Sequence, residues 1–142
     1  MNRTAFFGLV VVLTFLLTAC PSTQTPVTNV AGTWTGFAGD LESDTRKTPI
    51  TAEFDQTGTD LSGTGYFGPV VPGADSSGPI TGNVEGATVI FSFSFLAGSD
   101  GETATYEFTG TAEGETIEGT VAAGLEGSVL EPQEGGFILE RQ

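Results

Sequence analysis

This chain contains few types of side chain that could act in catalysis or bind a metal ion. The 142 residues include 18 Asp and Glu, 4 Lys and Arg, a single Cys and no His. Without His, neither a Ser-His-Asp triad nor a Cys-His pair can form, and one Cys gives neither a disulfide nor a thiolate cluster. Paired carboxylates are the acid-base groups that remain. Because they fall on polar strand faces or in loops, where water solvates them, we expect neither enzymatic activity nor a cofactor.

One acidic segment, Asp40-Leu41-Glu42-Ser43-Asp44, places carboxylates at alternate positions, as calcium-binding loops do. The similarity stops there, because Thr45 and Thr51 stand where such a loop needs Gly at its sixth position and Glu at its twelfth. We therefore predict a solvated acidic loop and no metal site.

The single cysteine, Cys20, ends a short apolar segment. The run from Ala5 to Leu17 has about 13 residues, too few for a bilayer core of ~30 Å, and is typical of a signal peptide. Its end, Leu17-Thr18-Ala19-Cys20, resembles the lipobox of bacterial lipoproteins. That resemblance implies that residues 1–19 are removed and that Cys20 is acylated, which would anchor the protein to a membrane. The alternative is an ordinary secretory signal with an incidental cysteine.

The residues after Cys20 bear on where the domain is held. Residues 21–29 are rich in Pro, Thr and Ser and carry no charge, so we predict a flexible tether over 20–29 and a β-domain over 30–142. Pro21 stands where lipoproteins of the inner membrane commonly have Asp. The resemblance therefore implies lipid anchoring in the cell envelope, at the outer membrane if the cell has one and otherwise at the outer face of the plasma membrane.

Hydrophobic alternation with a period of two dominates the chain from residue 30 onward. Between residues 88 and 96, the valine at 89 and the phenylalanines at every second position after it share one face. The segment 81–89 recurs 28 residues later at 109–117, and a shorter copy lies at 57–61. Gly in each copy predicts a tight turn between two strands. The predicted strands are 31–37, 49–56, 60–67, 79–85, 88–96, 103–112, 115–122 and 135–140.

One face of these strands is apolar and predicts the core. Its apolar members are Trp34, Ile50, Ala52, Phe54, Leu61, Phe67, Ile80, Val84, Val89, Phe91, Phe93, Phe95, Tyr106, Phe108, Ile117, Val121, Phe137 and Leu139. The same face contains five glycines, which we expect to leave room for aromatic rings and to let the strands bend: Gly63, Gly65, Gly82, Gly110 and Gly119. Eight sequential strands with one apolar face can close and so remove both sheet edges. We predict an all-β fold, an eight-stranded antiparallel up-and-down (meander) β-barrel. Turn spacing alone leaves a β-sandwich as the alternative.

Gly32-Thr33-Trp34, at the start of the first predicted strand and followed by a meander, resembles the opening of avidin-like and lipocalin-like barrels. In those families the G-x-W motif places its Trp at the closed end of the barrel, and the same place is implied for Trp34. Biotin binding is not implied, because avidins line their pocket with several Trp residues and this chain has one.

The meander order predicts two unlike ends. Tight turns at 57–59, 85–86 and 113–114 share one end with the tether, and longer connections share the other. Binding residues concentrate on loops held by a rigid scaffold. We therefore expect a ligand- or partner-binding surface at the far end, with a lid packed over the core as the alternative use of the same residues. The candidate residues are Arg46, Lys47, Val70, Val71, Leu125 and Leu130.

Two classes of function follow from this organisation. In the first, the anchored domain is a non-catalytic binding module for a small apolar ligand or a protein partner, although nine aromatic residues on the apolar face favour a filled lumen. In the second, the net charge of -14 attracts basic proteins and repels nucleic acid, and the architecture resembles that of small acidic envelope lipoproteins that inhibit lysozymes. A purely structural envelope lipoprotein is a further alternative.

Overall fold

Eight β-strands make up the regular structure of the protein, in a computed structural model that describes residues 26–43, 45–68, 76–97, 101–125 and 133–142. All eight predicted strands are present, with boundaries shifted by a few residues. Among the residues described, no helix is long and apolar enough to cross a membrane. The strands are β1 (Gly32–Gly39), β2 (Lys47–Thr57), β3 (Asp60–Phe67), β4 (Ser77–Glu85), β5 (Thr88–Ala97), β6 (Glu102–Glu113), β7 (Thr116–Leu125) and β8 (Gln133–Arg141).

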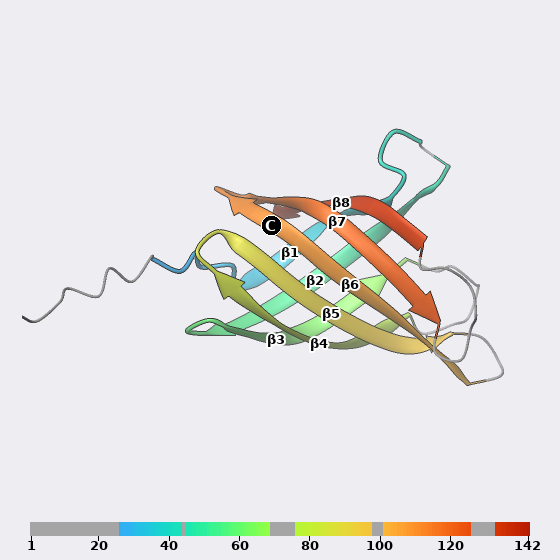
Figure 1. Ribbon diagram of the computed structural model, residues 1–142, viewed down its shortest axis with the longest axis horizontal. Helices are drawn as coiled ribbons and strands as arrows, with labels where there is room; N and C mark the ends of the chain where they lie inside the picture. The colour runs from blue at the N-terminus through green and yellow to red at the C-terminus, as the bar shows by residue number, and fades with distance from the viewer. Residues whose placement is uncertain (1–25, 44, 69–75, 98–100, 126–132) are drawn as a thin grey trace, which may run out of the picture.

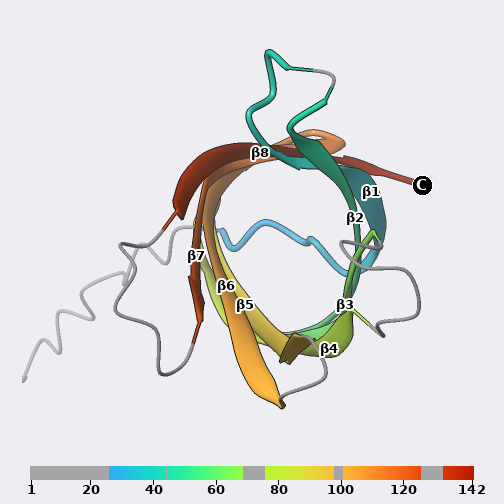
Figure 2. The same ribbon diagram turned by 90° about the vertical axis from the view of Figure 1, so that its right-hand side faces the viewer.

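The strands close into a barrel in the order of the sequence (Figure 2). Each strand pairs antiparallel with the next, and β8 returns to pair with β1, where Gly36 lies opposite Leu139 and Ala38 opposite Phe137. The predicted meander barrel is confirmed. The β-sandwich alternative is wrong, because the first and last strands are bonded edge to edge and no edge is left free.

The two ends of the barrel differ in their connections (Figure 1). The turns β2–β3, β4–β5 and β6–β7 lie together at one end, here called the tight-turn end, and the opposite end is called the long-loop end. Gly58, Gly86 and Gly114 have φ of 63°, 61° and 63°, a left-handed conformation that favours Gly in two-residue hairpin turns. These glycines are spaced by 28 residues, so the repeat in the sequence is a repeat of hairpin turns.

Neighbouring hairpins are joined at the tight-turn end by backbone hydrogen bonds. In each tight turn, the residue after the glycine has a carbonyl that accepts an N–H from a later strand. The pairs are Thr59 with Val84 at 2.7 Å, Ala87 with Ala112 at 2.8 Å, and Glu115 with Arg141 at 2.9 Å. The same bond therefore recurs around this end and ties the turns to one another.

Aromatic rings in mutual contact occupy the interior. The predicted core residues are at most 8% exposed, except for half-buried Tyr106. Phe91 and Phe108 stack with centroids 4.5 Å apart and 3° between their planes, and Phe137 meets Phe108 edge-on at 5.2 Å. Four further apolar residues, Val30, Ala38, Ala104 and Ala112, also belong to the core, although the expected core did not include them.

Two of the five core glycines make room for rings, as predicted. A Cβ on Gly65 would lie 2.7 Å from the Phe93 ring, and one on Gly110 would lie 2.7 Å from Phe137. At Gly63 and Gly119 the obstacle is different, because a Cβ there would strike the backbone of the neighbouring strand. Close approach of strands, and not only ring packing, therefore explains these glycines.

The Gly65→Ala substitution tests this packing. We expect it to lower the free energy of unfolding by about 1–3 kcal/mol, because the added methyl group would force the Phe93 ring to move. The matched control is Gly124→Ala on β7, where a Cβ meets nothing within 4 Å and the change should stay within about 0.5 kcal/mol. Urea unfolding of both variants measures the difference, and equal stabilities would contradict the packing described.

Residues 26–31, here called the strap, cross the tight-turn end and cover it (Figure 2). The side chain of Gln56, at the end of β2, accepts the Val30 N–H at 2.7 Å and donates to the Thr28 carbonyl at 3.0 Å. Thr28 in turn donates its N–H to the Gly86 carbonyl at 2.9 Å, and Val30 is fully buried. Of the predicted tether, residues 28 and 29 thus lie against the barrel.

Arg141 fixes the strap from the other side. Its guanidinium lies 4.7 Å from the Trp34 ring and donates to the carbonyls of Ala31 at 3.1 Å and Asn29 at 2.7 Å. Trp34 is fully buried, and its Nε1–H donates to the Val30 carbonyl at 2.7 Å. Trp34 therefore lies at the covered, tight-turn end, the position implied by the G-x-W resemblance.

Two residues that were predicted to lie in long loops are in strands. Lys47 is the first residue of β2 and pairs with Gly39, and Leu125 is the last residue of β7 and pairs with Ala104. The predicted loop positions are wrong because backbone hydrogen bonding extends the ladders beyond the point where apolar alternation ends. The long connections are correspondingly shorter than predicted.

Candidate functional site

The structure places only some of the predicted binding residues. Arg46 and Lys47 lie at the long-loop end, as predicted, because β2 begins at Lys47. Leu125 ends β7 at the same end, but its side chain is not among those described. The other candidates, Val70, Val71, Leu130 and the lipidation candidate Cys20, lie outside the described residues.

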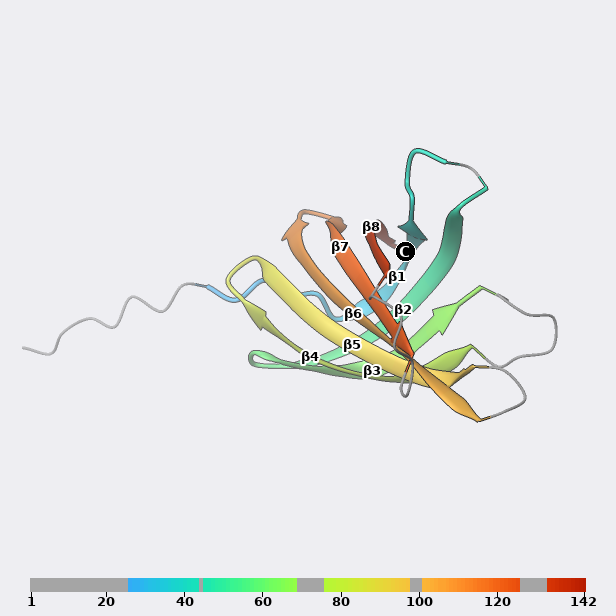
Figure 3. The ribbon, with the colours of Figure 1, turned by 45° about the vertical axis from the view of Figure 1, so that its right-hand side comes forward.

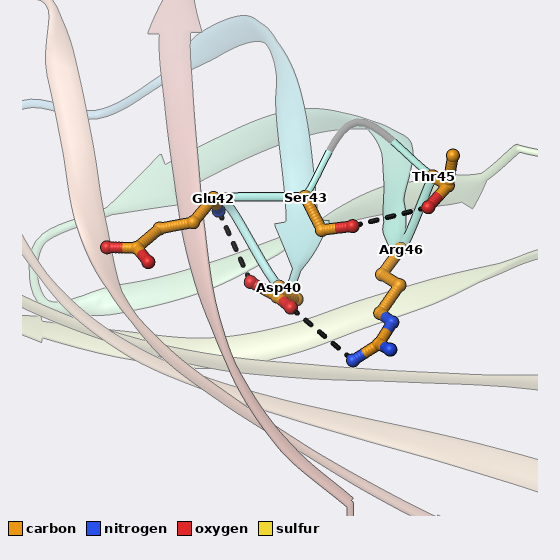
Figure 4. Close-up of polar contacts among 5 residues, drawn as sticks. All are labelled: Asp40, Glu42, Ser43, Thr45 and Arg46. Atoms are coloured by element: carbon orange, nitrogen blue, oxygen red, sulfur yellow. Dashed lines mark hydrogen bonds and ion pairs between the residues drawn. The ribbon is translucent and has the colours of Figure 1, made fainter.

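The β1–β2 connection projects from the long-loop end of the barrel (Figure 3) and is organised around Asp40 (Figure 4). The Asp40 carbonyl accepts the Ser43 N–H at 3.0 Å, and its carboxylate accepts the Glu42 N–H at 3.3 Å. Arg46 approaches the same carboxylate at 3.8 Å, but the two side chains are 76% and 47% exposed, so the ion pair contributes at most about 1 kcal/mol.

The same connection is the acidic segment whose alternation suggested calcium. The Glu42 carboxylate points away from Asp40 (Figure 4). Within the described ranges, no three acidic or sulfur-bearing side chains gather in a way that could hold a metal ion. The Asp40 carboxylate instead stabilises a turn, and Arg46 lies beside it.

Four large apolar side chains are exposed toward the long-loop end and are here called the rim. Its members come from the last residues of β1, β3 and β5 and from the β1–β2 connection, and they point away from the core. They are Phe37, Leu41, Tyr66 and Leu96, which are 40%, 39%, 47% and 65% exposed. Lys47 lies over the Phe37 ring at 5.0 Å, and Leu41 lies against Gly136 of β8. Charged residues share this end of the barrel with the rim, namely Asp40, Glu42, Arg46, Lys47, Glu102 and Glu134.

The outer wall toward the tight-turn end is acidic instead. All the carboxylates placed there are exposed, and Arg141 is the basic residue that the described strands bring to this end. The carboxylates are Glu53, Asp55, Asp60, Glu85, Glu113, Glu115, Glu118 and Glu140. Most of the described carboxylates thus lie toward the strap, whereas the rim lies at the other end of the barrel.

Inside the rim, Tyr106 closes the aromatic stack. Its ring lies 4.2 Å from that of Phe67 and 5.6 Å from that of Phe95, and it is half-buried. Burial raises the pKa of the Tyr106 hydroxyl above its ordinary value of 10.0, because a phenolate there would lose solvation.

The raised pKa of Tyr106 predicts a pH dependence of stability. Above pH 10 the unfolded chain loses the phenolic proton first, so stability is complete below that pH and decreases as pH rises toward the folded pKa. Ultraviolet titration of a Tyr66→Phe variant, which leaves Tyr106 as the sole tyrosine, should show a midpoint above 10. A Tyr106→Phe variant should lose less stability than the parent between pH 9 and the folded pKa, and an identical loss would contradict the assignment.

A shallow groove of about 370 Å³ lies on the outer wall of β4, β5 and β6. It is lined by Thr81, Gly82, Ile90, Phe91, Ser92, Glu107 and Thr109, of which Phe91 has its side chain in the core. Thr81 pairs with Ser92, and Ser92 pairs with Glu107, so these three form one row across the strands. The groove therefore combines hydroxyls, one carboxylate and an exposed aliphatic side chain.

No protein-family model, curated protein or solved structure matches this chain, and its function is therefore inferred from its own residues. Neither the rim nor the groove was predicted from the sequence, since the predicted binding surface was assigned to loop residues and not to outward positions of the strands. A signal was available, because Phe37, Tyr66 and Leu96 each alternate with core positions near the end of a strand.

Proposed function

We propose that this protein is a lipid-anchored component of the cell envelope, a non-catalytic module whose long-loop end binds a protein partner. The single observation that carries the proposal is the rim. The rim brings four exposed large apolar side chains to one end of the barrel, and two of them are aromatic, a residue type that is enriched at protein interfaces. Arg46 and Lys47 belong to the same surface and add positive charge to it.

The orientation of the barrel supports this role. The strap enters at the tight-turn end, so an anchor at Cys20 would hold that end toward the membrane and leave the rim facing away. The chain from Cys20 to Thr28 can extend to about 29 Å at most, which keeps the barrel close to the surface. The lipobox resemblance of Leu17-Thr18-Ala19-Cys20 supports the anchor. The G-x-W resemblance supports an avidin-like or lipocalin-like scaffold.

A small apolar ligand inside the barrel is a weaker candidate than a protein partner. The described part of the interior is taken up by aromatic rings in contact with one another, from Phe54 near the strap to Phe95 and Tyr106 at the far end. A ligand there would have to displace side chains that pack against each other. A partner at the rim requires no such rearrangement.

Site-specific photo-crosslinking in cells of the source organism tests the partner. A photoreactive residue at position 37, 66 or 96 should yield one discrete protein adduct, and the same residue at the acidic positions 53 or 118 should yield none. Adducts of equal intensity at both ends, or adducts to lipid alone, would overturn the proposal.

The anchor has a separate test. Labelled palmitate should be incorporated into the wild-type protein and not into a Cys20→Ser variant, and only the wild type should sediment with membranes. A Cys20→Ser variant that retained the label would contradict acylation at this residue.

Capture of basic proteins by charge is a second candidate, favoured by the exposed carboxylates of the outer wall. Such capture is fast at low salt and weakens as salt screens the surface charge. Binding that is unchanged between 50 mM and 500 mM salt would exclude this mode.

A further inference from the structure

The outer-wall groove has the composition of a site for a cation with an aliphatic stem. Glu107 supplies a carboxylate at one side, and Ser92 lies next to it across the β5–β6 pair. Ile90 is 42% exposed and offers an apolar surface beside Thr109, its partner on β6. A volume of about 370 Å³ falls within the range of small-molecule sites, so the groove can hold one long side chain.

The carboxylate of Glu107 has no basic neighbour on its own part of the barrel. Residues 76–125, which include β4 to β7, contain neither Lys nor Arg. The basic residues placed by the structure lie on the β1–β2 connection, at the start of β2 and at the end of β8. No lysine or arginine of the surrounding strands therefore competes with an incoming cation for the Glu107 carboxylate.

We infer that this groove binds an alkylammonium group, such as the side chain of a lysine on a basic protein partner. The ammonium group donates hydrogen bonds to the Glu107 carboxylate and to the hydroxyls of Ser92 and Thr81, and its methylene stem packs on Ile90. Lysine presents a compact charge with three donors on a flexible apolar stem, which matches one carboxylate beside hydroxyls and an aliphatic surface.

The inference extends the second candidate function to a named site, and it does not depend on the rim. The groove lies on the side wall of the barrel, across β4, β5 and β6, whereas the rim lies toward the long-loop end. Failure of the crosslinking experiment at positions 37, 66 and 96 would leave the inference about the groove unaffected. Failure of the groove to bind a cation would likewise leave the proposal about the rim unaffected.

Tetralysine is a suitable probe, with the full chain held in a non-ionic detergent and its amide resonances followed by NMR. Saturable shifts are expected at Thr81, Ser92 and Thr109, on the three strands of the groove. Glu107→Gln should weaken tetralysine about tenfold, since the amide oxygen can still accept a hydrogen bond but the negative charge that strengthens it is lost, while the shape of the side chain is kept. Ile90→Ser should weaken it about threefold through loss of apolar contact.

The matched control is Glu118→Gln, which removes another exposed carboxylate, on the outer face of β7. It should change the affinity less than twofold. Equal weakening by Glu107→Gln and Glu118→Gln would show attraction by net charge alone and would overturn the site. Shifts that map away from the groove, or larger shifts with a neutral sugar such as maltose than with tetralysine, would overturn it as well.

Discussion

Replacing Phe108 with Ala is expected to lower the free energy of unfolding by about 3–5 kcal/mol, the largest effect of any change considered. Phe108 is fully buried, and its ring contacts those of Phe91, Phe93 and Phe137. Truncation therefore removes an aromatic ring from the middle of the stack and leaves a cavity that strands closed into a barrel cannot collapse to fill. A domain of this size has a total stability of about 5–15 kcal/mol, so much of it would be lost.

Urea unfolding followed by circular dichroism measures the effect of Phe108→Ala. Leu96→Ala is the matched control, because Leu96 is an apolar strand residue of the rim and not of the core. Its effect should stay within about 0.5 kcal/mol. A loss of less than about 1 kcal/mol for Phe108→Ala would contradict the tightly packed interior.

Replacing Arg141 with Ala is expected to lower the free energy of unfolding by about 2–3 kcal/mol, the second largest effect. The guanidinium stacks on Trp34 and makes two hydrogen bonds to carbonyls of the strap, at Ala31 and Asn29. Arg141→Lys keeps the charge but cannot donate from a planar fork to both carbonyls, so it should recover only part of the loss.

Tryptophan fluorescence gives a second measurement for Arg141, because Trp34 is the only Trp in the chain. In Arg141→Ala the strap should loosen, water should reach the indole, and the emission should shift to longer wavelength. Arg46→Ala is the control, because Arg46 is highly exposed and its ion pair with Asp40, at 3.8 Å, is weak. This substitution should leave both the stability and the emission unchanged. A blue emission retained in Arg141→Ala would show that the strap does not depend on this residue.

The fold could be predicted from the sequence because the residue pattern of each strand indicates its two faces and the turns that bound it. Alternation from Val89 to Phe95 separates an inner from an outer face, and a slip of one residue would exchange the two. Gly58, Gly86 and Gly114 mark the turns at equal spacing. These signals are local, so they can be found without knowledge of which strands lie side by side.

The features that the sequence did not predict depend on contacts between distant residues. Arg141 donates a hydrogen bond to the carbonyl of Asn29, 112 residues away, and the local sequence of neither residue predicts this contact. The groove likewise requires that Ser92 and Glu107 be placed beside each other by strand pairing. Lys47 and Leu125 were placed in loops because apolar patterning describes side chains, whereas the extent of a ladder is set by backbone hydrogen bonds.

The pairing of β1 with β8 has a consequence for the order in which the chain folds. Every other strand pair joins neighbours in the sequence, so seven of the eight ladders can form as hairpins with short loops to close. The β1–β8 ladder joins Gly36 to Leu139 and must bring together the two ends of the domain at a much greater entropic cost. We expect this seam to form last during refolding and to open first, so that hydrogen exchange at Gly36 and Leu139 is faster than exchange across β5 and β6.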